Sequence, residues 1–506
     1  MSKNINGLGL NTFLFSKELF VFAIVFVLYI LFPTNNSSLD AYAYAGYVEY
    51  NSYLFKPHHL LSHALVYVLA APFEVIGISV DALWFGKLIN ALFQVINLWV
   101  FYRILLRLNI DKKQILSIVL VLGFSCNLWQ YSTENEVYIV PILFSLLGSL
   151  YFLKYSLQPK VKFLVFSGTF AAIACVFHQL HFFWWLGLLI GFCWMQRNLK
   201  TFLLYATPAL LVPIAYALVL VFYEQQEFTF TNLYQFMLYD FLQEGIVESS
   251  YSWQGWKSIL FQAVNTVRIF LQAHPNIYVL LKTHWIYFVP LIISLILGLQ
   301  LLWQFFKQKN VFKKRQNNSK LFANVHLFIV ITIYLFAFYS YGNIEFLVSL
   351  PFALFLFLAV KFTLDKHFVK RFVLLLFIWN FSFAIFPDSY YKYYNDEELV
   401  DYIIEHPNDT FLVKNSAVGN HYFYKTGINY PPNVLFYDKV NKDMLQSLLL
   451  NKTIYTDVID KPEVFDRQKI DGMGDEKINL NNYQKEAIFS FDGLYGTSTV
   501  YKISSK

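Results

Sequence analysis

The chain has 506 residues, of which 57% are apolar and 14% are charged. Ordinary globular chains carry roughly 25% charged residues, and the apolar residues here form runs too long for soluble cores. The composition excludes a string of soluble domains and predicts a mainly α, polytopic membrane protein. The net charge of +6 comes from Lys and Arg in short loops, which is a sign of membrane topology. No nucleic-acid partner is expected.

The first apolar run, residues 19–33, ends about ten residues before the cleavage-like triplet Ala43-Tyr44-Ala45, too far for the usual signal peptide. It predicts an uncleaved helix with a cytoplasmic N-terminus that carries Lys3. Ten further spans follow, so about eleven transmembrane helices are expected. They are residues 83–106, 115–132, 137–153, 163–178, 182–196, 201–223, 285–306, 322–341, 343–361 and 372–387.

Basic residues cluster in five loops, and a consistent topology places all five in the cytoplasm. This works only if residues 60–77, which contain Pro72, lie along the outer membrane face without crossing. The C-terminus is then extracytoplasmic, on a bacterial-type inner membrane. Residues 1–387 form the membrane domain, with a first outer loop at 34–82 and a large outer loop at 224–284. Residues 388–506 are predicted to form a small α/β domain, with strands near 410–414, 433–437, 453–457 and 495–503.

The stretch from Ser38 to His63 is the most distinctive in the sequence, because it gathers tyrosines, histidines and the carboxylate of Asp40 directly after the first span. A carboxylate here could be a helix N-cap that faces water. Aromatic surroundings could instead raise its pKa and let it take a proton from an attacking hydroxyl. We predict that Asp40 is a general base.

Histidines recur at the same predicted face. His58 and His59 follow Pro57, and His59 and His63 are four residues apart, on one face of a helix. Such imidazoles can ligate a metal, donate hydrogen bonds to a phosphate or sugar, or simply anchor an interfacial helix. A second group, His178, Gln179 and His181, interrupts a run that is otherwise uncharged, where polar groups are costly unless paired.

Further polar residues are expected near the outer ends of the spans. Glu134, Glu136 and Tyr138 lie between two apolar runs, where charge usually has a function, although a solvated turn is the alternative. Lys87 could bind a phosphate or extend to the interface. Glu345 could bind substrate or cap a helix.

Together these motifs resemble the C-type glycosyltransferases, the integral membrane enzymes that use polyprenyl-phosphate sugars. The resemblance is to the branch of protein O-mannosyltransferases and the lipid A aminoarabinose transferase. It rests on Asp40 at the start of the first outer loop, Pro57-His58, the turn from Thr133 to Tyr138, and His178 to His181. Many relatives have Asp-Glu at the first position, whereas Ala41 follows Asp40 here.

The resemblance implies transfer of a sugar from a polyprenyl-phosphate donor to a lipid, glycan or protein hydroxyl, with Asp40 as the base. No cofactor is expected to be required, although a divalent metal stays possible. The substrate-binding residues are expected to be His58, His59, Lys87, Glu134, Glu136, Tyr138, His178, Gln179, His181 and Glu345. Two alternatives stay open: a transporter of lipid-linked glycans, and a metal-dependent enzyme that uses His59, His63, His178 and His181.

Overall fold

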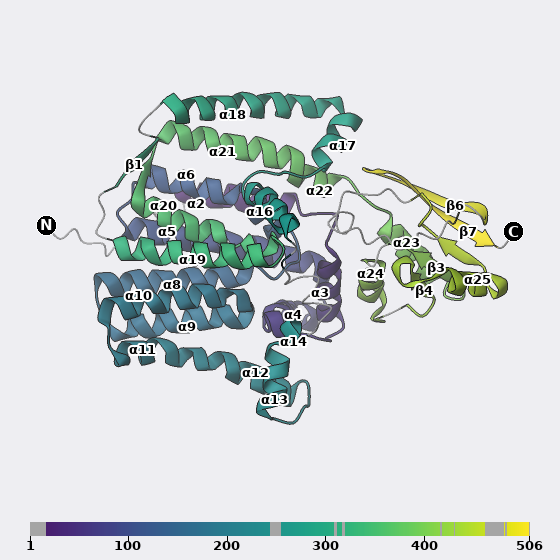
Figure 1. Cartoon of the computed structure of the whole chain (residues 1–506), viewed down its shortest axis with the longest axis horizontal. Helices are drawn as coiled ribbons and strands as arrows, with labels where there is room; N and C mark the ends of the chain where they lie inside the picture. The colour runs from purple at the N-terminus through teal and green to yellow at the C-terminus, as the bar shows by residue number, and fades with distance from the viewer. Residues whose placement is uncertain are drawn as a thin grey trace.

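The computed structural model describes residues 17–242, 253, 255–307, 311–315, 319–414, 417–429, 431–460, 480 and 483–504. Lys3 and parts of the large outer loop and the C-terminal domain lie outside these residues. The described chain consists of a bundle of long helices whose axes run side by side, and a smaller mixed domain at one end of the bundle (Figure 1).

Six helices or unbroken helical segments of the described chain are long and apolar enough to cross a membrane, so this is a multi-pass membrane protein. A bent pair, α6 and α7, meets at 66° and could form a seventh. The predicted count of eleven is therefore not confirmed, although every predicted span coincides with a helix. The six are Ala82–Arg107, Ile139–Leu157, Leu199–Phe222, Trp285–Lys307, Lys320–Tyr339 and Lys366–Tyr390.

Several helices begin at side chains that cap their first turns. Asp81 accepts from the backbone N–H of Trp84 at the start of α5, and Asp111 and Asp365 do the same for α6 and α21. The N-terminal half of the bundle consists of α2 (Lys17–Leu31), α5 (Ala82–Arg107), α6 (Lys112–Gly123), α7 (Cys126–Ser132), α8 (Ile139–Leu157), α9 (Val161–Phe177), α10 (Phe182–Gln196), α11 (Leu199–Ala206), η3 (Thr207–Leu210) and α12 (Leu211–Phe222).

The second half of the bundle adds four long helices and a short two-stranded ribbon that the sequence did not predict. A π-helical turn, η6 (Phe381–Ile385), joins α21 to α22. These elements are η4 (Trp285–Tyr287), α18 (Phe288–Lys307), β1 (Phe312–Lys314), α19 (Lys320–Tyr339), η5 (Glu345–Leu347), α20 (Leu350–Lys361), β2 (Phe362–Leu364), α21 (Lys366–Asn380) and α22 (Phe386–Tyr390).

Short helices gather at the end of the bundle that faces the C-terminal domain (Figure 1). The helix of residues 62–75 contains Pro72 and is only 14 residues long, shorter than a usual span. The large outer loop contains the amphipathic helix α16. The short elements are α3 (Leu39–Glu49), η1 (Pro57–His59), α4 (Ser62–Val75), η2 (Gln179–His181), α13 (Phe230–Met237), α14 (Tyr239–Leu242), α16 (Trp256–Arg268) and α17 (Asn276–Thr283).

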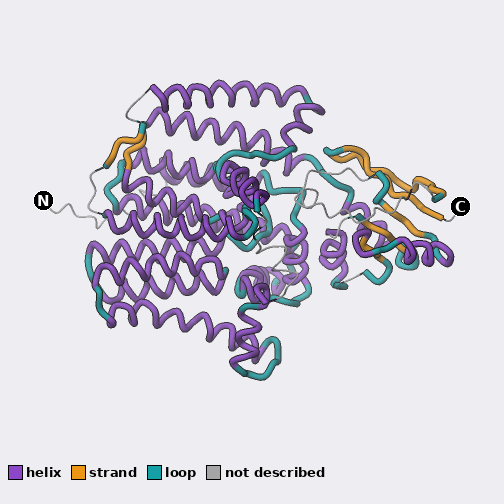
Figure 2. Tube along the Cα trace, viewed as in Figure 1, coloured by secondary structure: helices purple, strands orange, loops and turns teal. Residues whose placement is uncertain are grey.

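The C-terminal domain contains a five-stranded sheet of order β4-β3-β5-β7-β6, in which β4-β3-β5 are parallel and β5-β7-β6 antiparallel (Figure 2). All four predicted strands are present, and β6 is an addition. The elements are α23 (Asp396–Glu405), β3 (Thr410–Val413), α24 (Ala417–Thr426), β4 (Val434–Phe436), η7 (Tyr437–Lys439), α25 (Lys442–Asn451), β5 (Ile454–Thr456), β6 (Gln484–Gly493) and β7 (Gly496–Ser504).

Candidate active site

The helix that carries Asp40 is held at its first turn by the loop of residues 133–138. Ser38, and not Asp40, is the N-cap of α3, because its Oγ accepts from the N–H of Ala41. The Ser38 backbone N–H donates to Glu134 Oε2 (3.0 Å), and its hydroxyl donates to Glu136 Oε1 (2.7 Å). Both acids therefore fix the position of Asp40 through the start of α3.

Side chains of helix α5 hold the loop of residues 133–138 and the segment before α3 through hydrogen bonds. The side-chain amide of Asn90 donates to the carbonyl oxygens of Glu134 (2.8 Å) and Glu136 (2.6 Å). Lys87 Nζ donates to the carbonyl of Thr34 (2.8 Å). A Cβ on Gly86 would come within 1.9 Å of Asn135 Oδ1, so the loop can pack this closely only against a glycine. Lys87 thus holds the chain that leads to Asp40.

The carboxyl groups near Asp40 differ in how readily they ionise. Asp40 keeps exposed side-chain surface, but the surrounding protein and the negative charge of Glu345 raise its pKa to about 6. Glu136 is buried, and burial together with the charges of Glu345 and Asp40 raises its pKa well above the ordinary value. Above pH 6 Asp40 is therefore an ionised, accessible carboxylate, whereas the raised pKa of Glu136 favours its protonated form.

Glu345, at the start of η5, lies near Asp40 and Glu136 although it is about 200 residues or more away in the sequence. Its Oε2 accepts from the hydroxyl of Tyr138 (2.9 Å) and from Asn343 Nδ2 (3.3 Å). The Tyr138 ring in turn lies 5.0 Å from that of His178. Tyr138 therefore connects the carboxyl group of Glu345 with the histidines.

A cavity of about 1080 Å³ opens beside α3, next to a smaller one of about 220 Å³. Ser38, Glu134, Glu136 and Glu345 all line the smaller cavity. The two cavities are adjacent, because they share five lining residues. These are Asn36, Gln130, Arg268, Ile344 and Asp388.

Arg268 is the cationic residue shared by the two cavities, and the sequence analysis missed it. It is half-buried, its Nη1 donates to Asn265 Oδ1 (3.3 Å), and its Nε has no hydrogen-bond partner among the described residues. Leu260, Val264 and Arg268 are spaced four apart on α16 and line the large cavity. One helix face thus presents apolar side chains and then a guanidinium group, which suits an anion with an apolar tail.

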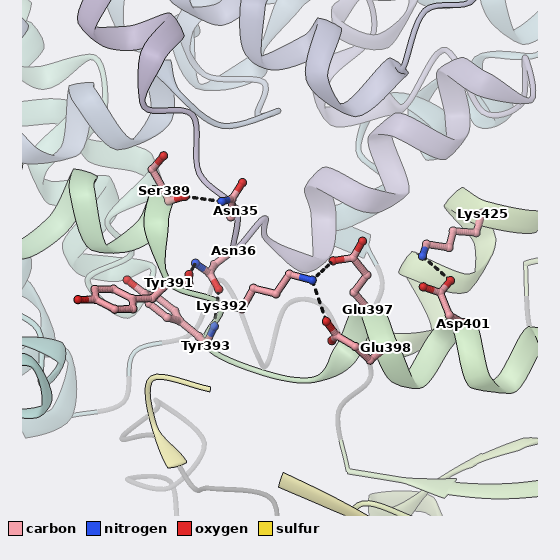
Figure 3. A network of polar contacts seen from close by, with 10 residues as sticks. All are labelled: Asn35, Asn36, Ser389, Tyr391, Lys392, Tyr393, Glu397, Glu398, Asp401 and Lys425. Carbon is pink, nitrogen blue, oxygen red and sulfur yellow. Dashed lines mark hydrogen bonds and ion pairs between the residues drawn. The ribbon is translucent and has the colours of Figure 1, made fainter. Parts of the chain in front are cut away.

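The loop before α3 is also tied to the entry of the C-terminal domain (Figure 3). The Asn35 amide donates to the Ser389 carbonyl, and Asn36 Nδ2 donates to the Tyr391 carbonyl (2.7 Å). The backbone N–H of Tyr393 donates back to Asn36 Oδ1 (2.7 Å). Asp388, a second residue that sequence reasoning missed, accepts from Gln130 Nε2 (3.1 Å).

Four histidines form a separate cluster, which is defined here as His58, His59, His63 and His178. Ring centroids of His58 and His178 are 4.5 Å apart, and those of His59 and His63 are 4.9 Å apart. His58 Nδ1 lies 3.6 Å from Asp240 Oδ2. Burial lowers the pKa of His59 well below its ordinary value, so this ring is neutral at pH 7.

Gln179 and His181 make contacts within the protein. Gln179 Nε2 donates to the hydroxyl of Tyr216 (2.9 Å) and to the carbonyl of Met237 (2.6 Å). His181 Nδ1 lies 2.7 Å from Ser145 Oγ, inside the bundle. Of the residues predicted to bind substrate, Glu134, Glu136 and Glu345 line the cavity, whereas Gln179 and His181 do not.

A metal-dependent enzyme would need a set of ligands around one ion. In the part of the chain that the structure describes, no three His, Cys, Asp or Glu side chains are placed to hold one metal ion. In the histidine cluster, the ring pairs His58–His178 and His59–His63 pack edge to face, as does the His59 ring against Tyr44.

No protein-family model and no curated protein sequence matches the chain. Among solved structures, it is similar to the oligosaccharyltransferase of Archaeoglobus fulgidus, with 11% identity and a TM-score of 0.49 over 88% of this chain and 70% of that one. It is also similar to ArnT of Cupriavidus metallidurans, with 10% identity and a TM-score of 0.42 over 96% and 97%.

A third match is the protein O-mannosyltransferase Pmt1-Pmt2 complex of S. cerevisiae bound to its sugar donor, with 16% identity and a TM-score of 0.31 over 43% of this chain and 34% of that one. All three matches are C-type glycosyltransferases, the class that the sequence motifs resemble. None of the TM-scores reaches 0.5, so the chemistry of this chain has to be argued from its own residues.

Proposed function

We propose that this protein is a glycosyltransferase that moves a sugar from a polyprenyl-phosphate donor to an acceptor hydroxyl at the outer face of the membrane. The observation that carries the proposal is the cavity that brings Arg268 together with the start of the Asp40 helix. A donor of this kind has an apolar chain and a phosphate. On the cavity face of α16, Leu260 and Val264 suit the apolar chain and Arg268 suits the phosphate.

In the proposed reaction, the Asp40 carboxylate takes the proton of the acceptor hydroxyl. The acceptor oxygen then forms a bond to the anomeric carbon, and the bond from that carbon to the phosphate oxygen breaks. The electron pair leaves with the lipid phosphate, whose added charge Arg268 stabilises. Phosphate is a good leaving group, so the site has to supply positioning and a base.

The test supplies the protein in detergent or proteoliposomes with radiolabelled polyprenyl-phosphate hexose and pentose donors and a cell-envelope acceptor fraction. Wild type is expected to transfer label, and Asp40→Asn is expected to lose at least 100-fold in rate, because removal of a general base costs about 10²–10⁴. Asp111→Asn, which alters a capping acid at the opposite end of α5 and α6, is the matched control.

Transfer by Asp40→Asn at the wild-type rate would show that another group is the base. If no donor is used, while the protein carries labelled glycolipid across vesicle membranes, it is a transporter of lipid-linked glycans, and the same polar groups line its path.

A further inference from the structure

The large cavity has a second end, away from the apolar face of α16, whose wall comes from the C-terminal domain and its entry segment. Nine residues from this part of the chain line the cavity, and Tyr42 of α3 lies against one of them, His421. The nine are Asp388, Lys392, Tyr393, Tyr394, Asp396, Glu397, Ala417, His421 and Tyr495. The C-terminal domain therefore forms part of the same space that Arg268 and Leu39 line.

Aromatic rings make up much of this wall. The rings of Tyr42 and His421 stack at 4.1 Å with an interplanar angle of 13°. Tyr495 lies 5.1 Å from Tyr393 and 5.4 Å from Tyr394 between ring centroids. Tyrosines combine an apolar ring face with a polar hydroxyl, and so they suit a ligand such as a sugar ring that has apolar faces and hydroxyl edges.

Two polar residues of the lining have unused hydrogen-bonding capacity. Gln272 is only 3% exposed, and its Oε1 has no hydrogen-bond partner among the described residues. Ser37 is half-buried, and its Oγ also has no partner there. Both atoms are buried as placed, and an unpaired buried polar atom is costly. A rotation of either side chain toward the cavity would let it bond to a ligand hydroxyl.

The charges at this end favour a ligand without negative charge. Lys392 Nζ donates to Glu397 Oε2 and Glu398 Oε1, both at 2.7 Å (Figure 3). One positive charge is thus shared between two carboxylates, and Asp396 adds a further negative charge to the lining. A uronic acid or phosphorylated glycan would meet like charges here.

We propose that this end of the cavity is the acceptor subsite and that its ligand is a neutral saccharide, held against the wall formed by Tyr42 and the tyrosines of the C-terminal domain. The inference rests on the proposed transferase function, to which it adds the class of acceptor. Leu39 and Tyr42 line the cavity on either side of Asp40 in α3, so a saccharide bound there lies beside the helix that carries the base.

The experiment measures binding of the full-length protein in detergent, without donor, to an array of neutral, uronate-containing and phosphorylated glycans and of peptides. Wild type is expected to bind one or more neutral glycans. Tyr42→Ala and Tyr495→Ala are expected to weaken that binding at least tenfold, whereas Tyr42→Phe keeps the stacked ring and most of the binding. Tyr278→Ala removes a tyrosine that is 69% exposed on α17 and outside the cavity, and is the matched control.

An array with no neutral glycan bound, or binding only to acidic glycans or peptides, would overturn the proposal. Equal binding by both alanine variants, with thermal unfolding used to establish that they are folded, would overturn the location. The two proposals can fail separately. If the protein binds glycans in a way that depends on Tyr42 but transfers no label from the donors, the saccharide subsite stands and the transferase function is overturned.

Discussion

The cavity beside Arg268 and the histidine cluster lie close together and are linked through Tyr138, yet they differ in every property that matters for catalysis. The cavity is open, and it brings carboxyl groups and a half-buried guanidinium group to one volume. The histidine cluster is largely buried and aromatic, and burial lowers the pKa of His59. A cavity of about 220 Å³ beside His58 is lined mainly by phenylalanines and holds no charged carboxyl or guanidinium group. Polar residues in apolar surroundings can therefore be part of the packing, and a cavity that gathers several charged groups distinguishes the candidate reaction site.

If the cavity and not the histidine cluster is the reaction site, the largest loss of activity is expected from substitution of Arg268. Arg268→Leu should lower kcat/KM for a polyprenyl-phosphate donor about 100-fold, because removal of one donor to a developing charge costs about 10²–10³ in rate. Steady-state transfer assays measure the change. Lys282→Leu, which removes an exposed charge from α17, should have little effect. An equal loss in both variants would mean that general surface charge, and not a phosphate site, is responsible.

A smaller effect is expected from pH. A base must be ionised, and the raised pKa of Asp40, about 6, means that kcat/KM rises with pH through 6 and levels off above it. At pH 5 it should be about tenfold below the plateau, since about a tenth of the groups are then ionised. A profile that is flat from pH 5 to 8 would contradict Asp40 as the base.

The raised pKa also has a consequence for stability. A carboxyl group whose pKa is raised in the folded state favours folding at low pH and opposes it once the pH exceeds that pKa. Asp40→Asn should therefore unfold at the same or a higher temperature than wild type at pH 8, although it is inactive. A thermal midpoint clearly below that of wild type would show that the carboxylate stabilises the fold.

The smallest effect is expected in the histidine cluster. Both ring nitrogens of His59 are buried without a hydrogen-bond partner among the described residues, so His59→Phe should keep transfer within threefold and leave the thermal midpoint unchanged or raise it. His178→Phe is the matched comparison, because His178 Nδ1 accepts from the N–H of Leu180 (3.2 Å) and its loss should cost about 1 kcal/mol. A 100-fold loss of transfer in His59→Phe would assign the cluster to the reaction.

Elements with a local pattern could be predicted from the sequence. The apolar runs predicted the position of every long helix, and the short strands expected near residues 410–414 and 453–457 are present as β3 and β5. The polar strand β6 has no such pattern, since its sequence is QKEAIFSFDG. The helical count differed mainly because four predicted spans form helices shorter than 18 residues, α2, α9, α10 and α20. A fifth is broken by the bend between α6 and α7, where the sequence shows only continued apolar composition.

Only some residues of the candidate site could be predicted from the sequence. Asp40 stood out because of its isolated position after the first span. Arg268 and Asp388 did not, because each gains its place through contacts with segments more than a hundred residues away, such as the bond from Gln130 to Asp388. The one available signal was that Arg268 is the basic residue at the end of an amphipathic helix.

The bonds of Asn35 and Asn36 to residues 388–393 affect the order in which the protein can mature. Asp40 is made among the first residues of the chain, but the segment that fixes its approach loop leaves the ribosome only after the last membrane helix. Before that point, the approach loop can bond only to early segments of the chain, through Thr133 (3.2 Å), Lys87, Glu134 and Glu136. The reaction centre is completed as one of the last steps of synthesis, after all the apolar helices have been made.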